Sequence, residues 1–156
     1  MRRWTMVVLV VAAVAAVTLP VRTANVRIVL IAGRPSHPAG MHEFRAGSML
    51  LQKALSSVPG VTADVYTMGW PTKTVDGKTV DDNAALDTAH AVMVYADGGK
   101  GHPAIQGDHA KILSDLAKKK IGLGFMHYGV EIPSTNGGPE FLDWIGIPQR
   151  GEAWYS

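Results

Sequence analysis

The sequence predicts an α/β fold built on a doubly wound parallel sheet with a layer of helices on each face, three layers in all. Continuous apolar runs rich in β-branched residues occur at residues 26–32 and 91–97, and such runs are typical of strands covered on both faces. Segments whose apolar residues recur at helical spacing separate the strand-like runs, and this alternation favours parallel over antiparallel pairing of the strands. Right-handed crossovers leave few alternative topologies for this order of elements.

The first part of the chain has the pattern of strand, loop, helix and strand. Residues 26–32 (VRIVLIA) predict the first strand, which ends in the Gly- and Pro-rich loop GRPSHPAGMHE. Apolar side chains recur at helical spacing over residues 43–58, and Gly60 follows as a C-terminal cap. Residues 61–67 alternate between apolar and polar side chains, as a second strand does.

The second part of the chain repeats this pattern after an excursion. The near-repeat KTVDGKTVDD within residues 69–83 predicts either a small hairpin or a solvated excursion, and a brief helix follows over residues 82–88. Residues 91–97 are the third core strand, Asp108 is placed to cap a helix, and the fourth core strand covers about residues 120–126. We expect the flavodoxin-like strand order 2-1-3-4, in which ligands bind outside the carboxyl ends near the switch point between the first and third strands.

Residues 1–24 have the composition of a signal peptide, because the basic MRRWT precedes the apolar run MVVLVVAAVAAVTL. That run is short for a membrane-spanning helix, but an uncleaved anchor stays open because residues 21–24 are a poor cleavage site. We expect an exported protein, periplasmic or extracellular, that meets a membrane only if this segment is uncleaved. Its removal takes away three of the 15 basic residues, so 12 remain against 13 acidic ones and the formal charge moves from +2 to −1. No basic surface then remains for nucleic acid.

Most of the histidines fall in or beside the loops that follow the first, third and fourth core strands. They are His37, His42, His102, His109 and His127. Glu43, Asp97, Tyr128 and Glu131 belong to the same edge of the predicted sheet. Polar side chains that gather at one edge from distant positions are typical of a binding or catalytic site.

Several of these residues also have structural explanations. Glu43 favours the start of a helix wherever it occurs, because a carboxylate there complements the helix dipole. His109 is expected to be a solvated helical residue. His127 could be a hydrogen-bonded histidine at the edge of the core rather than a catalytic one.

The sequence limits the chemistry that such a site can perform. The chain has no cysteine, which excludes disulfides, thiolate metal ligands and cysteine nucleophiles. No HExxH or His-x-His motif is present, so a divalent metal would need ligands assembled in space, with His37, His102 and His127 as candidates. Gly98 and Gly99 open a Gly-rich stretch that lacks the phosphate-loop ending, although its backbone amides could hold an anion or sugar hydroxyls. The cofactor stays open.

Three segments carry a resemblance to a known family. They are VRIVLIAGRPSHPAGMHEFRAGSMLLQKAL, AVMVYADGGKGHPAIQGDH and KIGLGFMHYGVE. Together they resemble the ThuA-like (trehalose-utilisation) domain of the class I glutamine amidotransferase-like superfamily, over residues 26–146. Amidotransferase relatives place a cysteine nucleophile in the turn after the corresponding strand, where this chain has His127. The resemblance implies sugar metabolism, on trehalose-type disaccharides or their keto forms, and the lack of cysteine argues against glutaminase chemistry.

We therefore expect an exported protein whose residues 25–156 form a ThuA-like domain that acts on a small carbohydrate by histidine-based acid–base chemistry. The expected catalytic residues are His127, Glu131 and Tyr128. The expected substrate-binding residues are His37, His42, Glu43, Asp97, Gly98, Gly99 and His102. The alternatives are a non-catalytic carbohydrate-binding or assembly module and an inactive fragment, because ThuA-like domains continue beyond the length of this chain. Whether the protein is an enzyme, and whether it forms a homo-oligomer, stay open.

Overall fold

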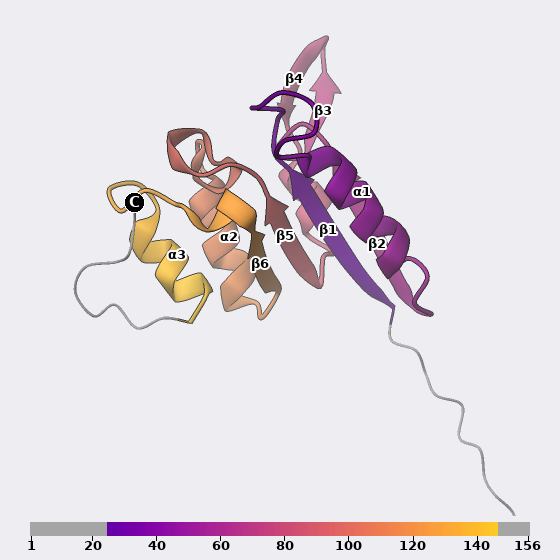
Figure 1. The fold of residues 1–156 in the computed structure, drawn as a ribbon. Helices are drawn as coiled ribbons and strands as arrows, with labels where there is room; N and C mark the ends of the chain where they lie inside the picture. The colour runs from indigo at the N-terminus through magenta and orange to yellow at the C-terminus, as the bar shows by residue number, and fades with distance from the viewer. Residues whose placement is uncertain (1–24, 147–156) are drawn as a thin grey trace, which may run out of the picture.

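A computed structural model describes residues 25–146, and the predicted signal peptide and the tail after residue 146 lie outside the described residues. Four parallel strands form the central sheet (Figure 1). They are β1 (Val26–Ala32), β2 (Val61–Tyr66), β5 (Ala91–Tyr95) and β6 (Gly122–Met126). Their order is β2-β1-β5-β6, which confirms the order predicted for the four core strands. Strand β5 ends two residues earlier than predicted, and β6 begins about two residues later than predicted.

Helices cover both faces of this sheet. The helix α1 (Phe44–Leu55) contacts β1 and β2, while α2 (His109–Lys118) contacts β6 and α3 (Gly138–Trp144). Val29 and Ile31 belong to the core cluster that includes residues of α2 and α3, and Leu30 between them is also buried. Because successive side chains of a strand point to opposite faces, Leu30 faces the layer that holds α1. The predicted layered α/β architecture is thereby confirmed for residues 25–146.

The excursion predicted after the second strand is a hairpin. Strands β3 (Thr72–Val75) and β4 (Lys78–Asp81) pair antiparallel, and all of their residues are exposed. Asp76 and Gly77 both have positive φ, of 50° and 75°, as the two central residues of a tight hairpin turn require. The brief helix expected over residues 82–88 is a 3₁₀ turn, η1 (Asn83–Leu86).

Several predicted boundaries differ from the structure for local reasons. Helix α1 ends at Leu55, three residues earlier than predicted, and Val58 is exposed in the following turn. Asp108 precedes α2 as expected, but its side chain makes no capping hydrogen bond. Lys120 has a φ of 66°, which is incompatible with an extended strand, so β6 begins only at Gly122.

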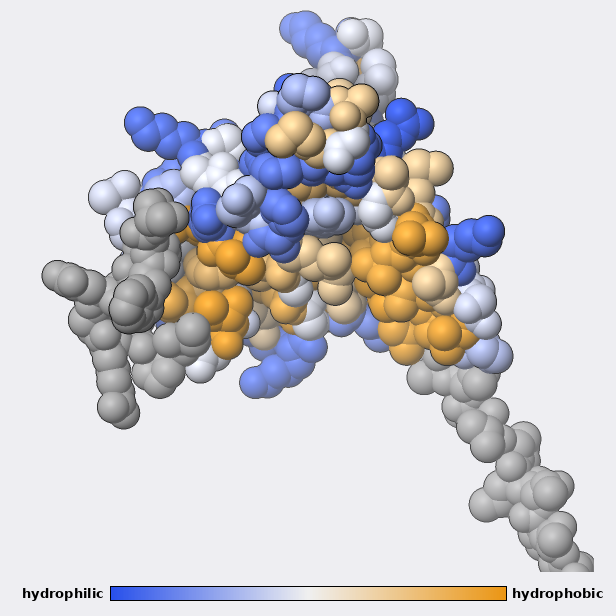
Figure 2. All heavy atoms as spheres, in the orientation of Figure 1, coloured by the Kyte–Doolittle hydropathy of each residue, from blue (hydrophilic) through white to orange (hydrophobic). Residues whose placement is uncertain are grey.

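Three short 3₁₀ turns follow the carboxyl ends of β5 and β6. They are η2 (Gly99–Gly101), η3 (Pro103–Ile105) and η4 (His127–Val130). Figure 2 shows hydrophilic residues gathered above the carboxyl ends of the strands, and apolar surface over α1, where Leu50 is 70% exposed. Within residues 25–146, no helix has the length and apolar character needed to cross a membrane.

Candidate functional site

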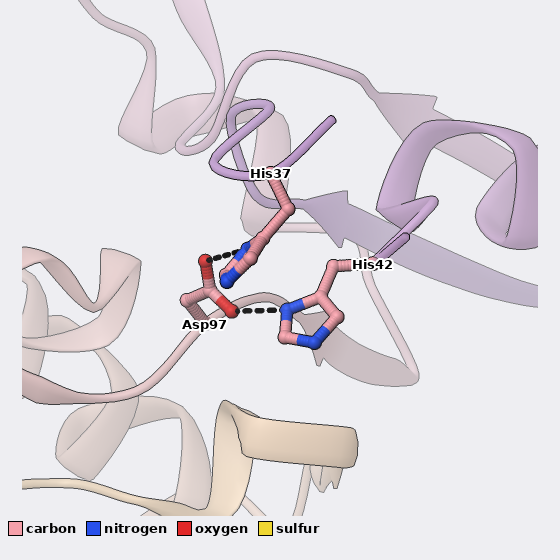
Figure 3. A group of neighbouring side chains, drawn as sticks. All are labelled: His37, His42 and Asp97. Atoms are coloured by element: carbon pink, nitrogen blue, oxygen red, sulfur yellow. Dashed lines mark hydrogen bonds and ion pairs between the residues drawn. The ribbon is translucent and has the colours of Figure 1, made fainter. Parts of the chain in front are cut away.

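The loops after β1 and β5 bring three predicted site residues together at the switch point of the sheet (Figure 3). The Nδ1 atom of His42 lies 2.9 Å from one carboxylate oxygen of Asp97, and the Nδ1 atom of His37 lies 3.6 Å from the other. The two imidazole rings are 3.9 Å apart between centroids. One carboxylate therefore faces two histidines that come from a single loop.

The start of α1 determines how His42 reaches Asp97. His42 has a φ of 51°, which is uncommon for a residue with a side chain, and its carbonyl accepts the N–H of Phe44 at 2.8 Å. Glu43 follows it, and its carboxylate accepts the N–H of Gly40 at 2.7 Å. Glu43 thus holds the loop in shape and does not join the cluster of His37, His42 and Asp97.

Asp97 is about a third exposed, and its surroundings favour the ionised form. Partial burial raises the pKa of this carboxyl, but hydrogen bonds from Ser36 and His42 and the nearby charges of His37 and His42 together outweigh the burial and lower the pKa. Asp97 is therefore a carboxylate at neutral pH and can only accept hydrogen bonds.

His127 reaches the same place from the loop after β6. Its ring centroid lies 4.7 Å from that of His42 and 4.5 Å from that of Tyr128. His127 directly follows β6, starts η4 and has a φ of 58°. A positive φ is uncommon for a residue with a side chain, and such strain is concentrated at functional sites.

The loops after β5 and β6 touch each other through their backbones. The N–H of Gly99 donates to the carbonyl of Glu131 at 2.8 Å. A Cβ atom on Gly98 would lie 2.8 Å from that same carbonyl oxygen and 2.9 Å from the carbonyl oxygen of Tyr128. Glycine at position 98 is therefore what allows η4 to approach the loop after β5 closely.

Together these loops form an open depression of about 490 Å³. It is lined by His37, His42, Asp97, Gly98, Gly99, Tyr128 and Glu131. Every lining residue was predicted from the sequence as a catalytic or substrate-binding residue, and His127 adjoins the group through its ring contacts. The structure thus brings most of the predicted site into one place.

His102 does not belong to this group. It is fully buried, its Nδ1 atom accepts the N–H of Ala104 at 3.0 Å, and its Nε2 atom donates to the carbonyl of Gly129 at 3.0 Å. Burial lowers its pKa to about 4, although the hydrogen bond to Gly129 opposes the shift. His102 is therefore a neutral histidine with both nitrogens occupied, and the expectation that it binds substrate or metal is corrected.

His109 is also buried, contrary to the expectation of a solvated residue. Its ring stacks on Trp70 at 3.8 Å, with 8° between the planes. Its Nδ1 atom donates to the carbonyl of Pro103 at 2.7 Å, and its Nε2 atom lies 2.8 Å from a carboxylate oxygen of Asp81. Through these contacts His109 fixes the end of the β3–β4 hairpin against the start of α2.

A second cavity, of about 600 Å³, lies beside the depression. Trp70, Asp81, Gln106 and His109 line it, and so does Asp97 of the histidine cluster. Trp70 was not among the predicted site residues, and its only signal in the sequence is an aromatic residue in the Gly-Trp-Pro turn after the second strand. The cavity gives the site room for a ligand larger than the depression alone would hold.

No protein-family model matches this chain, and no curated protein sequence does. The resemblance to ThuA-like domains therefore rests on the residues quoted for it. The geometry itself offers two kinds of chemistry. A carboxylate that holds an imidazole can support proton transfer, and two imidazoles with one carboxylate can bind a metal ion.

Proposed function

We propose that this protein is an exported ThuA-like protein that acts on a small carbohydrate, of trehalose or keto-disaccharide type, by histidine-based acid–base chemistry. The observation that carries the proposal is the 2.9 Å contact between His42 and Asp97 at the switch point, with His127 against the His42 ring. Ligands of doubly wound sheets bind at this place.

The contact between His42 and Asp97 provides a base. Because the ionised carboxylate accepts the Nδ1–H of His42, it favours the tautomer whose Nε2 atom carries a lone pair. Such an imidazole can take a proton from a sugar hydroxyl or from a carbon next to a keto group.

His127 provides a second group for proton transfer, because it approaches His42 from a different loop. A base and an acid on separate elements can act on two atoms of one substrate, so one takes a proton while the other returns one. Tyr128 and Glu131 line the depression and offer hydrogen-bonding groups to sugar hydroxyls. The polar lining and the adjoining cavity suit a molecule of disaccharide size.

A turnover assay with trehalose and with a keto-disaccharide tests the proposal. We expect His42→Ala and His127→Ala to reduce turnover about 100-fold or more, because each removes a proton-transfer group. His90→Ala is the matched control, since His90 is exposed and precedes β5 at the opposite edge of the sheet. Urea unfolding of each variant shows that the loss is not due to unfolding.

Two results would count against this function. Unchanged turnover in His42→Ala would remove the His42–Asp97 contact from the chemistry. If calorimetry detects disaccharide binding and the wild-type protein converts none of it, the protein is a carbohydrate-binding module and not an enzyme.

A further inference from the structure

We propose that His37, His42 and Asp97 form a binding site for one divalent transition-metal ion. Each residue offers one ligand atom, and these atoms all lie within 4.8 Å of one another. Figure 3 shows both imidazoles turned toward the carboxylate. Within residues 25–146, this is the one group of three or more potential metal ligands that comes so close together.

The separations suit a shared ion. Metal–nitrogen and metal–oxygen bonds of about 2.1 Å allow two ligand atoms to be at most about 4.2 Å apart. The contacts of Asp97 with His42 and His37, at 2.9 and 3.6 Å, already satisfy this limit. The three ligand atoms lie within 4.8 Å of one another, so the separation of any pair exceeds the limit of about 4.2 Å by at most roughly 0.6 Å. A small rotation of the exposed His37 side chain would bring its ligand atom within that limit.

The type of ligand selects the type of ion. Two imidazole nitrogens and one carboxylate oxygen suit Zn²⁺ and other first-row divalent ions, whereas Mg²⁺ and Ca²⁺ prefer oxygen ligands. A closed structural zinc site has four protein ligands, while three ligands leave a position for water or substrate. This open position would face the depression lined by Tyr128 and Glu131.

The residues around the three ligands support this assignment. Ser36 hydrogen-bonds the Asp97 carboxylate, and its hydroxyl also lies 2.9 Å from the Nδ1 atom of His37. An ion would displace Ser36 from His37 and leave the serine to orient Asp97, as groups behind metal ligands commonly do. Binding also requires both imidazoles to be neutral, which removes any repulsion between two rings 3.9 Å apart.

The ion would alter how the base is made. The binding of the ion stands without the proposed function, but its role in turnover rests on that function. A bound ion would lower the pKa of a coordinated water to about 7 and would thereby supply a base at this place. His42 would then act as a ligand, and His127 would keep its place as the group that returns a proton.

Calorimetric titration with Zn²⁺ tests the site in the full chain, after removal of any affinity tag and treatment with a chelator. We expect one ion per chain. His37→Ala and Asp97→Asn should each weaken Zn²⁺ binding at least tenfold. Replacing a residue that only supports a metal ligand already lowers metal affinity by about that factor. His90→Ala should bind as the wild type does. Co²⁺ gives a second measurement, since its visible absorption reports nitrogen and oxygen ligands and should be lost in His37→Ala.

His37 is the decisive position, because its side chain is exposed and its removal leaves the core intact. The proposal fails if Zn²⁺ does not bind below about 1 mM, or if His37→Ala and Asp97→Asn bind it as tightly as the wild type. Ion binding without sugar turnover would overturn the proposed function and leave the metal site. Turnover that survives chelation would overturn the ion's role and leave the acid–base function.

Discussion

Mild acid should destabilise the fold through His102. This fully buried histidine is neutral, with its pKa lowered to about 4 from the 6.5 of an exposed imidazole. The unfolded chain therefore takes up a proton as the pH falls below 6.5, while the folded protein resists protonation until about pH 4. Because the unfolded state binds more protons in this window, the free energy of unfolding falls between pH 6.5 and 4, and below pH 4 the loss is complete.

The size of the effect follows from the gap between the two pKa values. At about pH 4.5 the linkage relation gives a loss of about 2.5 kcal/mol relative to about pH 7.5. The limiting value at lower pH is about 3.4 kcal/mol, because each unit of pKa is worth about 1.36 kcal/mol. Such a loss is a large share of the stability of an ordinary domain.

Urea unfolding of the wild type and of His102→Gln, at about pH 7.5 and about pH 4.5, measures this contribution. Glutamine can still donate to the carbonyl of Gly129 but does not titrate, so the stability advantage of the wild type over the variant should shrink by about 2.5 kcal/mol in acid. Thr79→Ser is the control, because Thr79 is exposed on β4 and carries no titratable group. An advantage that stays constant between the two pH values would refute the assignment of His102 as a neutral buried histidine.

Substitutions at two positions test the backbone of the site. His127→Gly should be about 1 kcal/mol more stable than His127→Ala, because glycine adopts the φ of 58° at this position at lower energy than alanine does. Equal urea midpoints for the two variants would contradict backbone strain at this turn. Gly98→Ala should destabilise the fold by about 1–3 kcal/mol and reduce turnover, because its Cβ would meet the carbonyls of Glu131 and Tyr128. Gly101→Ala is the matched control, since a Cβ there meets no atom within 4 Å, and similar losses in both variants would exclude this contact as the cause.

The strand order and the place of the site could be predicted because they depend on local patterns. β1 and β5 read as continuous apolar runs since both of their faces are covered, and the carboxyl ends of neighbouring parallel strands meet at one edge. His42, Asp97 and His127 follow strands of that edge, so their approach follows from topology alone.

The roles of individual histidines could not be predicted, because they depend on distant partners. His37 and His102 both precede proline in a Gly-containing loop, yet one is exposed and the other is fully buried. The difference comes from the carbonyl of Gly129, which lies 27 residues beyond His102. His109 is likewise buried by Trp70 and Asp81, and no local pattern around it contains them.

The contacts between the loops after β5 and β6 have a consequence for how this fold can change during evolution. His102 bonds to Gly129, Gly99 bonds to Glu131, and Gly98 leaves space for the Glu131 carbonyl. The atoms that accept these contacts are backbone carbonyl oxygens, which every residue carries, so no change of side chain at position 129 or 131 compensates a replacement of His102 or Gly98, and homologous sequences should keep both residues. The loop over residues 34–41 is exposed, so its residues other than His37 can vary more freely than those of η4.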